Sequence, residues 1–181
     1  MESNGNTMRE VKLDKVVLNV AVGNDEAKLV RALKLLELVT GRTPVKNLSK
    51  KRIAAWKLRK GLPIGARVTL RKGKAGEILA KMLEAVDNKL NERQFTDAGF
   101  SFGVHEYIQI PGIGYQRDLG LIGLDVTATF KRAGYRTAQR KIKSGKVPKR
   151  HKVTRDEVVD YAKKNFKIDF EEYAKKTKNT K

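Results

Sequence analysis

Cysteine is absent from this sequence, which excludes disulfide bonds, thiolate metal sites and thiol nucleophiles. Histidine is scarce as well, since His105 and His151 are the only imidazoles. No apolar stretch approaches the roughly 18 residues that a membrane-spanning helix needs, and the chain does not open with a signal-peptide pattern. We therefore expect a soluble, cytoplasmic protein with no membrane partner.

Acidic residues are few beside the basic ones. The sequence has 20 Asp and Glu against 40 Lys and Arg, a formal net charge of +20 over 181 residues. A compact protein with this excess repels itself, so it is expected to work beside a polyanion that neutralises it. With 40% hydrophobic residues the chain can still build a core. Nucleic acid is the leading candidate for the polyanion.

The positive charge is concentrated in two segments that contain no acid, one between Glu37 and Glu77 and one between Asp125 and Asp156. Solvated surfaces normally mix both signs, and either segment alone could be a solubilising face. Two such segments favour a bound polyanion within the screening length of about 8 Å. Contacts from Lys and Arg to phosphates would position the protein without reading sequence.

Residue periodicity gives the expected elements. Alternation predicts strands at 15–23, 67–71, 102–110 and 124–131. A helical period predicts one helix from Glu26 to a cap at Gly41 and another over 78–90. Segments 44–48 and 53–58 are expected to be extended, and 60–65 to be a loop. The predicted fold is α+β, a largely antiparallel sheet with helices packed on one face.

The pattern also assigns residues to the two faces of this sheet. We expect the apolar face to include Val16, Leu18, Val20 and Val22, covered by helix residues Leu29, Val30, Leu33, Leu36, Ile78, Leu79, Met82, Leu83, Val86 and Leu90. The opposite, polar face is expected to carry Asn19, Arg67, Thr69, Arg71, Thr127 and Thr129. Such residues suit ribose hydroxyls and base edges, although Thr is common on any solvent-facing strand.

The C-terminal part changes in character after residue 135. Residues 136–152 are basic and poor in apolar side chains, which indicates an extension laid on RNA. Thr154 and Glu157 form a capping-box signature for a short final helix, while 1–6 and 175–181 are expected to be poorly ordered. We therefore divide the chain into an α+β RNA-binding domain, 1–135, and a basic extension with a terminal helix, 136–181.

Other nucleic-acid and enzyme classes fit less well. The basic-glycine-aromatic signature of base-stacking sheets is missing from 67–71, and Phe102 fits the core better than a binding surface. There is no Walker loop, and Gly112-Ile113-Gly114 lacks the third glycine of a dinucleotide site. His105 is expected to be a surface residue and His151 a phosphate contact. We expect no enzyme activity, metal, cofactor or small-molecule substrate; a DNA-compacting chromosomal protein stays as an alternative.

Several strings resemble one family in particular. Lys-Val-Val-Leu-Asn-Val-Ala-Val-Gly at 15–23, Thr-Gly-Arg-Thr-Pro-Val at 40–45 and Lys-Leu-Arg-Lys-Gly-Leu-Pro-Ile-Gly-Ala-Arg-Val-Thr-Leu-Arg at 57–71 resemble the universal large-subunit ribosomal protein five family. Phe-Ser-Phe-Gly-Val at 100–104, Gly-Leu-Asp-Val at 123–126, Gly-Tyr-Arg at 134–136 and the basic extension resemble its archaeal and eukaryotic branch.

This resemblance implies a structural protein of the ribosome's central protuberance that binds 5S rRNA and helps attach it to the large subunit. Its implied partners are 5S rRNA, large-subunit rRNA, P-site tRNA, a small-subunit head protein reached through an intersubunit bridge, and other central-protuberance proteins. Asn19 and Thr69 match family residues that contact 5S rRNA, and Arg42 stands where many bacterial members have Gln. Loop 57–65 matches the segment that reaches toward tRNA.

Two sets of candidate residues follow from the charge pattern and the resemblance together. The expected rRNA-binding residues are Asn19, Arg42, Lys46, Lys50, Lys51, Arg52, Arg67, Thr69, Arg71, Arg136, Arg140 and Lys141. The expected tRNA-facing loop residues are Lys57, Arg59, Lys60 and Gly61.

Overall fold

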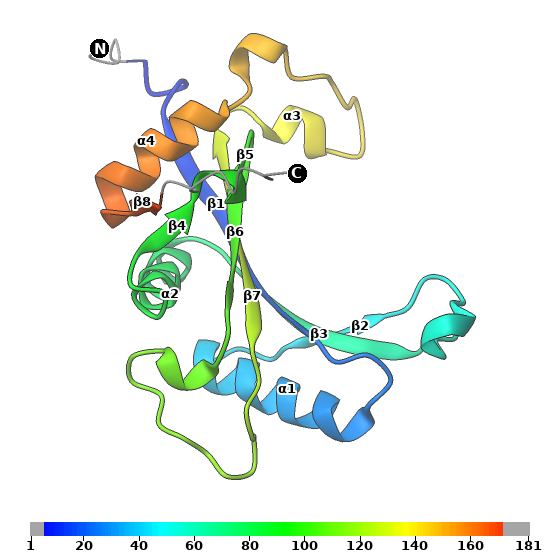
Figure 1. The fold of residues 1–181 in the computed structure, drawn as a ribbon. Coiled ribbons are helices and arrows are strands. Elements are labelled where there is room, and N and C mark those ends of the chain that lie inside the picture. The colour runs from blue at the N-terminus through cyan, green and yellow to red at the C-terminus, as the bar shows by residue number, and fades with distance from the viewer. Residues whose placement is uncertain (1–5, 172–181) are drawn as a thin grey trace, which may run out of the picture.

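A six-stranded antiparallel sheet with strand order β2-β3-β1-β7-β6-β5 forms the centre of the computed structural model, which describes residues 6–171 (Figure 1). Its strands are β1 (Val11–Ala21), β2 (Val45–Leu48), β3 (Pro63–Leu70), β5 (Phe95–Thr96), β6 (Gly99–Val104) and β7 (Leu124–Arg132). A separate parallel pair joins β4 (Lys89–Asn91) to β8 (Asp169–Glu171). The tail expected at 175–181, and residues 1–5 of the expected N-terminal fray, lie outside the described residues.

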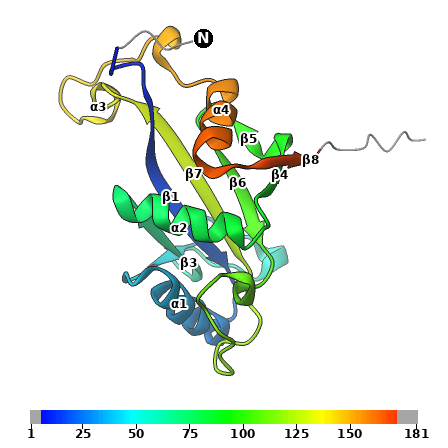
Figure 2. The ribbon, with the colours of Figure 1, turned by 90° about the vertical axis from the view of Figure 1, so that its left-hand side faces the viewer.

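Helices α1 (Glu26–Thr40), α2 (Gly73–Glu84) and α4 (Arg155–Phe166) cover one face of this sheet, as Figures 1 and 2 show from two directions. Strand residues Val16, Leu18 and Val20 are buried beneath them, and one hydrophobic cluster joins the strands to all three helices. The short helix α3 (Arg136–Gln139) lies apart from this core, beyond the end of β7. The predicted α+β fold, with helices on one face of an antiparallel sheet, is confirmed.

Helix α1 begins and ends where the sequence predicts. Asp25 accepts a hydrogen bond from the backbone N–H of Lys28 at 3.1 Å, and this bond, with the nearby Lys28 ammonium, lowers the pKa of the Asp25 carboxyl. Gly41 ends the helix with φ +61°, in the left-handed region that glycine favours.

The buried stripe of α1 differs from the predicted one. Leu29 and Leu36 are buried as expected, but Ala32 and Leu35 complete the stripe. Val30 is 53% exposed, so its assignment to the core was wrong. The short run of apolar residues fits two helical phases, and only the packing against β3 selects one of them.

Other predicted element bounds were wrong as well. Strand β3 begins at Pro63 rather than after Gly65, because Pro63 pairs with Leu48 at an irregularity in the β2–β3 register that tolerates a missing N–H. Residues 53–58 form a tight turn around the 3-10 helix η1 (Ala54–Trp56), closed by a bridge from Ile53 to Leu58. Helix α2 ends at Glu84, and Leu90 reaches the core from β4 instead.

Strand β6 stops at Val104, six residues before the predicted end. The 3-10 helix η3 (Tyr107–Gln109) follows, and Tyr107 is fully buried. The hydroxyl of Tyr107 accepts a hydrogen bond from the backbone N–H of Gln116 at 2.9 Å, which folds the long β6–β7 loop back on itself. This contact spans nine residues, so strand alternation could not reveal it.

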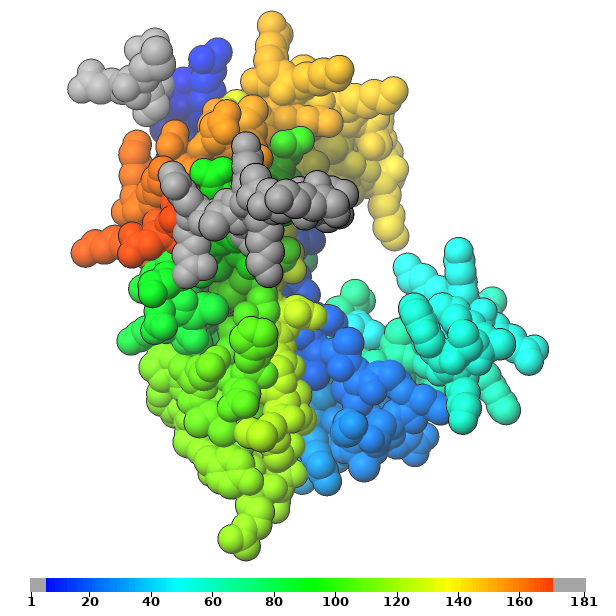
Figure 3. All heavy atoms as spheres, in the orientation of Figure 1, coloured from blue at the N-terminus to red at the C-terminus, as the bar shows by residue number. Residues whose placement is uncertain are grey.

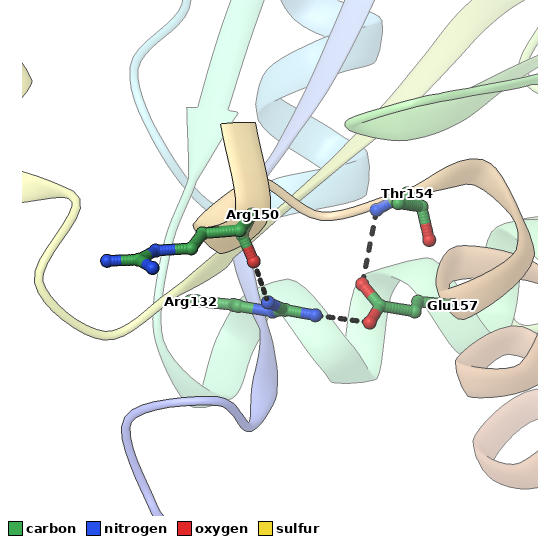
Figure 4. Close-up of polar contacts among 4 residues, drawn as sticks. All are labelled: Arg132, Arg150, Thr154 and Glu157. Carbon is green, nitrogen blue, oxygen red and sulfur yellow. Dashed lines mark hydrogen bonds and ion pairs between the residues drawn. The ribbon is translucent and has the colours of Figure 1, made fainter. Parts of the chain in front are cut away.

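Helix α4 is fastened to the end of β7 by a polar cluster (Figure 4). The predicted capping box is present, and the backbone N–H of Thr154 donates to the Glu157 carboxylate at 3.1 Å. The same carboxylate pairs with the guanidinium of Arg132, which is only 9% exposed and also donates to the carbonyl of Arg150. Val158 and Ala162 of α4 lie in the main hydrophobic cluster. The expected division of the chain into an RNA-binding domain, 1–135, and a basic extension, 136–181, stays a proposal.

Candidate nucleic-acid interface

The face of the sheet opposite the helices is polar and open. Asn19 pairs in register with Arg67 on β3, and Val17 pairs with Thr69 on β3 and with Thr127 on β7. Because paired residues point to the same side of a sheet, these side chains share one surface. Asp125 lies on this surface opposite Asn19, so phosphates are favoured on the β3 side rather than toward β6.

Asn47 belongs to this surface, although the sequence did not single it out. Its side-chain amide donates a hydrogen bond to the side-chain oxygen of Asn19 at 2.9 Å, from β2 across β3 to β1. The register places Asn47 opposite Gly65 of β3, which pairs in turn with Ala21 of β1. The pairing of 45–48 with β3 is a long-range feature, so only the expected extended segment at 44–48 hinted at it.

Strands β2 and β3 continue beyond the rest of the sheet as a projecting hairpin, which we call the arm, residues 45–67 (Figures 1 and 3). Its tip is ordered by hydrogen bonds in both directions between the backbones of Ile53 and Leu58, each 3.0 Å, and by a bond from the N–H of Gly61 to the carbonyl of Ser49 at 2.9 Å. The arm is therefore a defined structure and not a loose loop.

The arm brings together most of the cations predicted in the first acid-free segment. Exposed on it are Lys46, Lys50, Lys51, Arg52, Lys57, Arg59, Lys60 and Arg67. None of them forms an ion pair within residues 6–171. A shallow hollow of about 580 Å³ beside the tip is lined by Asn24, Arg52, Ala54, Lys57, Leu58, Arg59 and Leu62. These uncompensated charges make the surface of the arm electropositive.

Arg42 and Arg71 lie at the two ends of this region rather than on the arm. Arg42 follows the cap of α1, where its N–H donates to the Thr40 hydroxyl at 3.2 Å, and Arg71 directly follows β3. Both side chains are exposed. The structure thus places them next to the arm in the chain, and their contact with RNA stays a prediction.

The second acid-free segment forms a basic lobe at the far end of β7, residues 133–152. A hollow of about 590 Å³ in it is lined by Lys131, Arg132, Ala133, Gly134, Tyr135, Arg136, Gln139, Arg140 and Lys141. Arg132 and Lys131 already have acidic partners, Glu157 and Asp14. Arg136, Arg140 and Lys141 have none among the described residues, which leaves them for an external anion.

The ring of His151 has an internal role. Its Nε2 lies 2.8 Å from the carbonyl oxygen of Ala133, so the N–H donates there and ties the returning chain to the start of the lobe. The expected phosphate contact by this residue stays a prediction. His105, by contrast, is exposed as expected.

The arm and the lobe stand on the same side of the molecule, with a broad notch between them in the space-filling view (Figure 3). Figure 1 shows that helices α2 and α4 lie on the other side of the sheet. The polar face is therefore flanked by both basic regions. Their sequence positions, 45–67 and 133–152, gave no indication of this arrangement.

Two features of other protein classes are absent from the described part of the chain. Over residues 6–171 no group of three or more His, Cys, Asp or Glu could hold a metal ion. No helix in that range is long and apolar enough to cross a bilayer.

Comparisons with known proteins agree with the resemblance found in the motifs. The family described as "Ribosomal protein L5" matches residues 6–59, and a second family, described as the C-terminus of the same ribosomal protein family, matches residues 63–158. The first match ends within the arm tip, and the second includes the polar strands β3 and β7, the lobe and the start of α4.

Curated archaeal relatives cover almost the whole chain. "Large ribosomal subunit protein uL5" of Nanoarchaeum equitans is 46% identical over 89% of this chain and 96% of its own length. The proteins of the same name from Sulfolobus acidocaldarius and Methanobrevibacter smithii are 42% and 38% identical, over 90% and 91% of this chain and 92% and 98% of their own lengths. The chain therefore belongs to the uL5 family of large ribosomal subunit proteins.

Proposed function

We propose that this chain is a structural constituent of the large ribosomal subunit that binds 5S rRNA and helps attach it in the central protuberance. Membership of a ribosomal protein family supports the first part and makes it a cytoplasmic RNA-binding protein of translation, not an enzyme. The observation that carries the second part is the open polar face, which lies between two basic regions whose cations have no acidic partners in the described part of the chain.

On this surface the charged residues and the uncharged polar residues are proposed to have different roles. Exposed Lys and Arg of the arm and lobe neutralise phosphates, an interaction that gives affinity regardless of sequence. Asn19, Asn47 and Thr69 offer short donors and acceptors on a rigid sheet, where they can meet ribose hydroxyls and base edges of a folded RNA. Shape and these few polar groups then select the RNA.

The tip of the arm is proposed to face P-site tRNA. Lys57, Arg59, Lys60 and Gly61 are all exposed there, and the arm carries them away from the body of the protein (Figure 1). A projecting basic tip can touch a second RNA while the polar face holds the first one. Contacts to large-subunit rRNA, to other central-protuberance proteins and to a small-subunit head protein through a bridge complete the proposal and rest on the resemblance alone.

Binding of purified protein to 5S rRNA, tRNA and duplex DNA, each across a salt titration, tests the central part. We expect Asn19→Ala and Thr69→Ala each to weaken 5S rRNA binding roughly threefold to tenfold at constant salt. Lys50→Ala should mainly reduce the salt dependence, by about one unit in the slope of log K against log salt.

The measurements with duplex DNA distinguish the ribosomal proposal from the chromosomal alternative. If Asn19→Ala and Thr69→Ala weakened binding to a random-sequence duplex as much as binding to 5S rRNA, the polar face would have no selective role. If the wild-type protein held duplex DNA as tightly as 5S rRNA, the chromosomal alternative would replace the ribosomal proposal.

A further inference from the structure

The only tryptophan of the chain, Trp56, lies at the tip of the arm with 68% of its surface exposed. It contributes nothing to the hydrophobic cluster of the core. Within residues 6–171 its indole also takes part in no aromatic pair and no cation–π contact. A large aromatic ring is thus presented to solvent, with no packing role in the fold.

The backbone that carries Trp56 is fixed. It is the last residue of η1, and Lys57 after it adopts φ +54° and donates its N–H to the carbonyl of Ala54 at 3.0 Å. The Ile53–Leu58 bridge closes the turn on both sides, and the Leu58 side chain is buried beneath it. The ring is therefore held out by an ordered turn, so ordering it on binding costs little entropy.

The surroundings of Trp56 are cationic. Arg52, Lys57, Arg59 and Lys60 are exposed on the turn or directly beside it, and three of them line the hollow beside the tip. The nearest acids in the sequence are Glu37 and Glu77, because the segment between them has none. An exposed aromatic ring between cations complements a nucleotide: the ring matches the base, and the cations match the phosphates.

We propose that Trp56 is a stacking platform for an unpaired base of a structured RNA, whose neighbouring phosphates bind in the hollow lined by Arg52, Lys57 and Arg59. This inference rests on the proposed function in one respect, that the partner is RNA. It adds the kind of RNA element: a loop, bulge or end with a splayed base.

A fully paired duplex would engage the arm differently. Its bases are already stacked on one another, so it would offer the arm only phosphates and ribose, and the indole would stay in water. Insertion into an anionic membrane is disfavoured because Ala54 and Ala55 are the only exposed apolar neighbours of Trp56 within the turn. The structure therefore favours a looped RNA over both alternatives.

Fluorescence of this single tryptophan gives a direct test in the full-length protein. One titration uses a hairpin RNA with an unpaired loop, and a second titration uses a fully paired RNA of equal length at the same salt concentration. We expect the hairpin to quench Trp56 and to shield it from acrylamide, while the duplex binds without either effect.

Variants give the energetic side of the test. Trp56→Ala should weaken hairpin binding roughly fivefold to 150-fold and leave duplex binding unchanged, whereas Trp56→Phe should keep most of the hairpin affinity. Tyr115→Ala is the matched control, because Tyr115 is another exposed aromatic residue, 61% exposed, in the β6–β7 loop away from the arm. Hairpin affinity should not change in that variant.

The outcomes separate this inference from the proposed function. Unchanged hairpin affinity in Trp56→Ala, with no quenching by any RNA, would overturn the stacking role while a preference for 5S rRNA over duplex DNA still stood. Quenching and a blue shift with anionic phospholipid vesicles, but not with hairpin RNA, would overturn it in favour of a membrane contact. Absence of any preference for RNA would remove both proposals together.

Discussion

At the scale of single residues, Gly65 shows how closely β3 approaches β1. A Cβ atom added to Gly65 would lie 2.5 Å from the carbonyl oxygen of Val20 and 3.3 Å from the Cα of Ala21, both backbone atoms of β1. Neither neighbour can move without distorting the sheet. Gly65→Ala should therefore destabilise the protein by about 1–3 kcal/mol, measured by urea denaturation.

Gly76→Ala is a control that should change the stability in the opposite direction. Gly76 lies inside α2, and an added Cβ there would meet nothing within 4 Å. Gly76→Ala should stabilise the protein by about 0.5–1 kcal/mol, since alanine loses less entropy than glycine on entering a helix. If Gly65→Ala unfolded at the same urea concentration as the wild type, the close approach of β1 and β3 would be wrong.

The same scale shows what sequence reasoning could and could not find. Strand alternation placed Asn19 and Thr69 on the polar face, because that rule depends only on neighbours along one strand. It missed the Asn19–Asn47 hydrogen bond, which joins residues 28 positions apart and depends on the register of β2 with β3. It could not assign the ring of His151 to the Ala133 carbonyl for the same reason.

At the scale of elements, a half-buried charge pair helps to attach α4 to β7. The Arg132 side chain is 10% exposed and that of Glu157 37%. Among the described residues, Glu157 is the one acidic partner of Arg132, and the Nε of Arg132 has no hydrogen-bond partner. Glu157→Gln keeps an oxygen for the capping box but removes the charge. We expect it to destabilise the protein by about 1–3 kcal/mol, less than a fully buried pair would.

Two further variants distinguish charge from capping. Thr154→Ala tests the cap alone and should cost about 1 kcal/mol. Adding Arg132→Met to Glu157→Gln should restore part of the lost stability, because no uncompensated charge then stays buried. Amide hydrogen exchange should show faster exchange in α4 for the single Glu157 variant. Equal stability of the wild type and Glu157→Gln would contradict the proposed attachment.

Elements with a local signal were predicted well. The caps of α1 and α4, strand β7 and the central residues of β1 and β3 follow from capping residues and alternation within one segment, although β1 and β3 each begin four residues before the predicted start. The errors occur where a distant contact decides. Tyr107 lies in a 3-10 helix rather than a strand, and its hydroxyl accepts a hydrogen bond from Gln116. Leu90 belongs to β4, which pairs with β8. The bridge between Ile53 and Leu58 forms the tip of the arm where an extended segment was expected.

At the scale of the whole molecule, the acid-free basic regions lie on one side of the sheet. The arm and the lobe stand on the side of the polar face, while α2, β4 and α4 occupy the other side (Figures 1 and 3). Cations are present on both sides. The difference is that the arm and lobe hold them without acids in the sequence around them, whereas acids are interspersed on the helices. A polyanion should therefore bind on the notch side.

Because of this distribution, removing the same number of cations from the arm and from the helical side should change RNA binding by different amounts. If six to ten side chains neutralise phosphates, binding of the wild type to 5S rRNA should fall roughly 10³-fold to 10⁵-fold between 50 and 200 mM salt. Replacing Lys50, Lys51 and Arg52 on the arm by alanine should reduce the salt slope by about two to three units.

Replacing Lys81, Lys89 and Lys164 by alanine removes the same net charge from the helical side, where these side chains are exposed on α2, β4 and α4. Because a phosphate backbone seated in the notch does not reach that side, the slope should stay that of the wild type. Salt titrations of both triple variants against 5S rRNA make the comparison. Equal slopes in the two variants would mean that the net charge, rather than its placement on the arm, governs RNA binding.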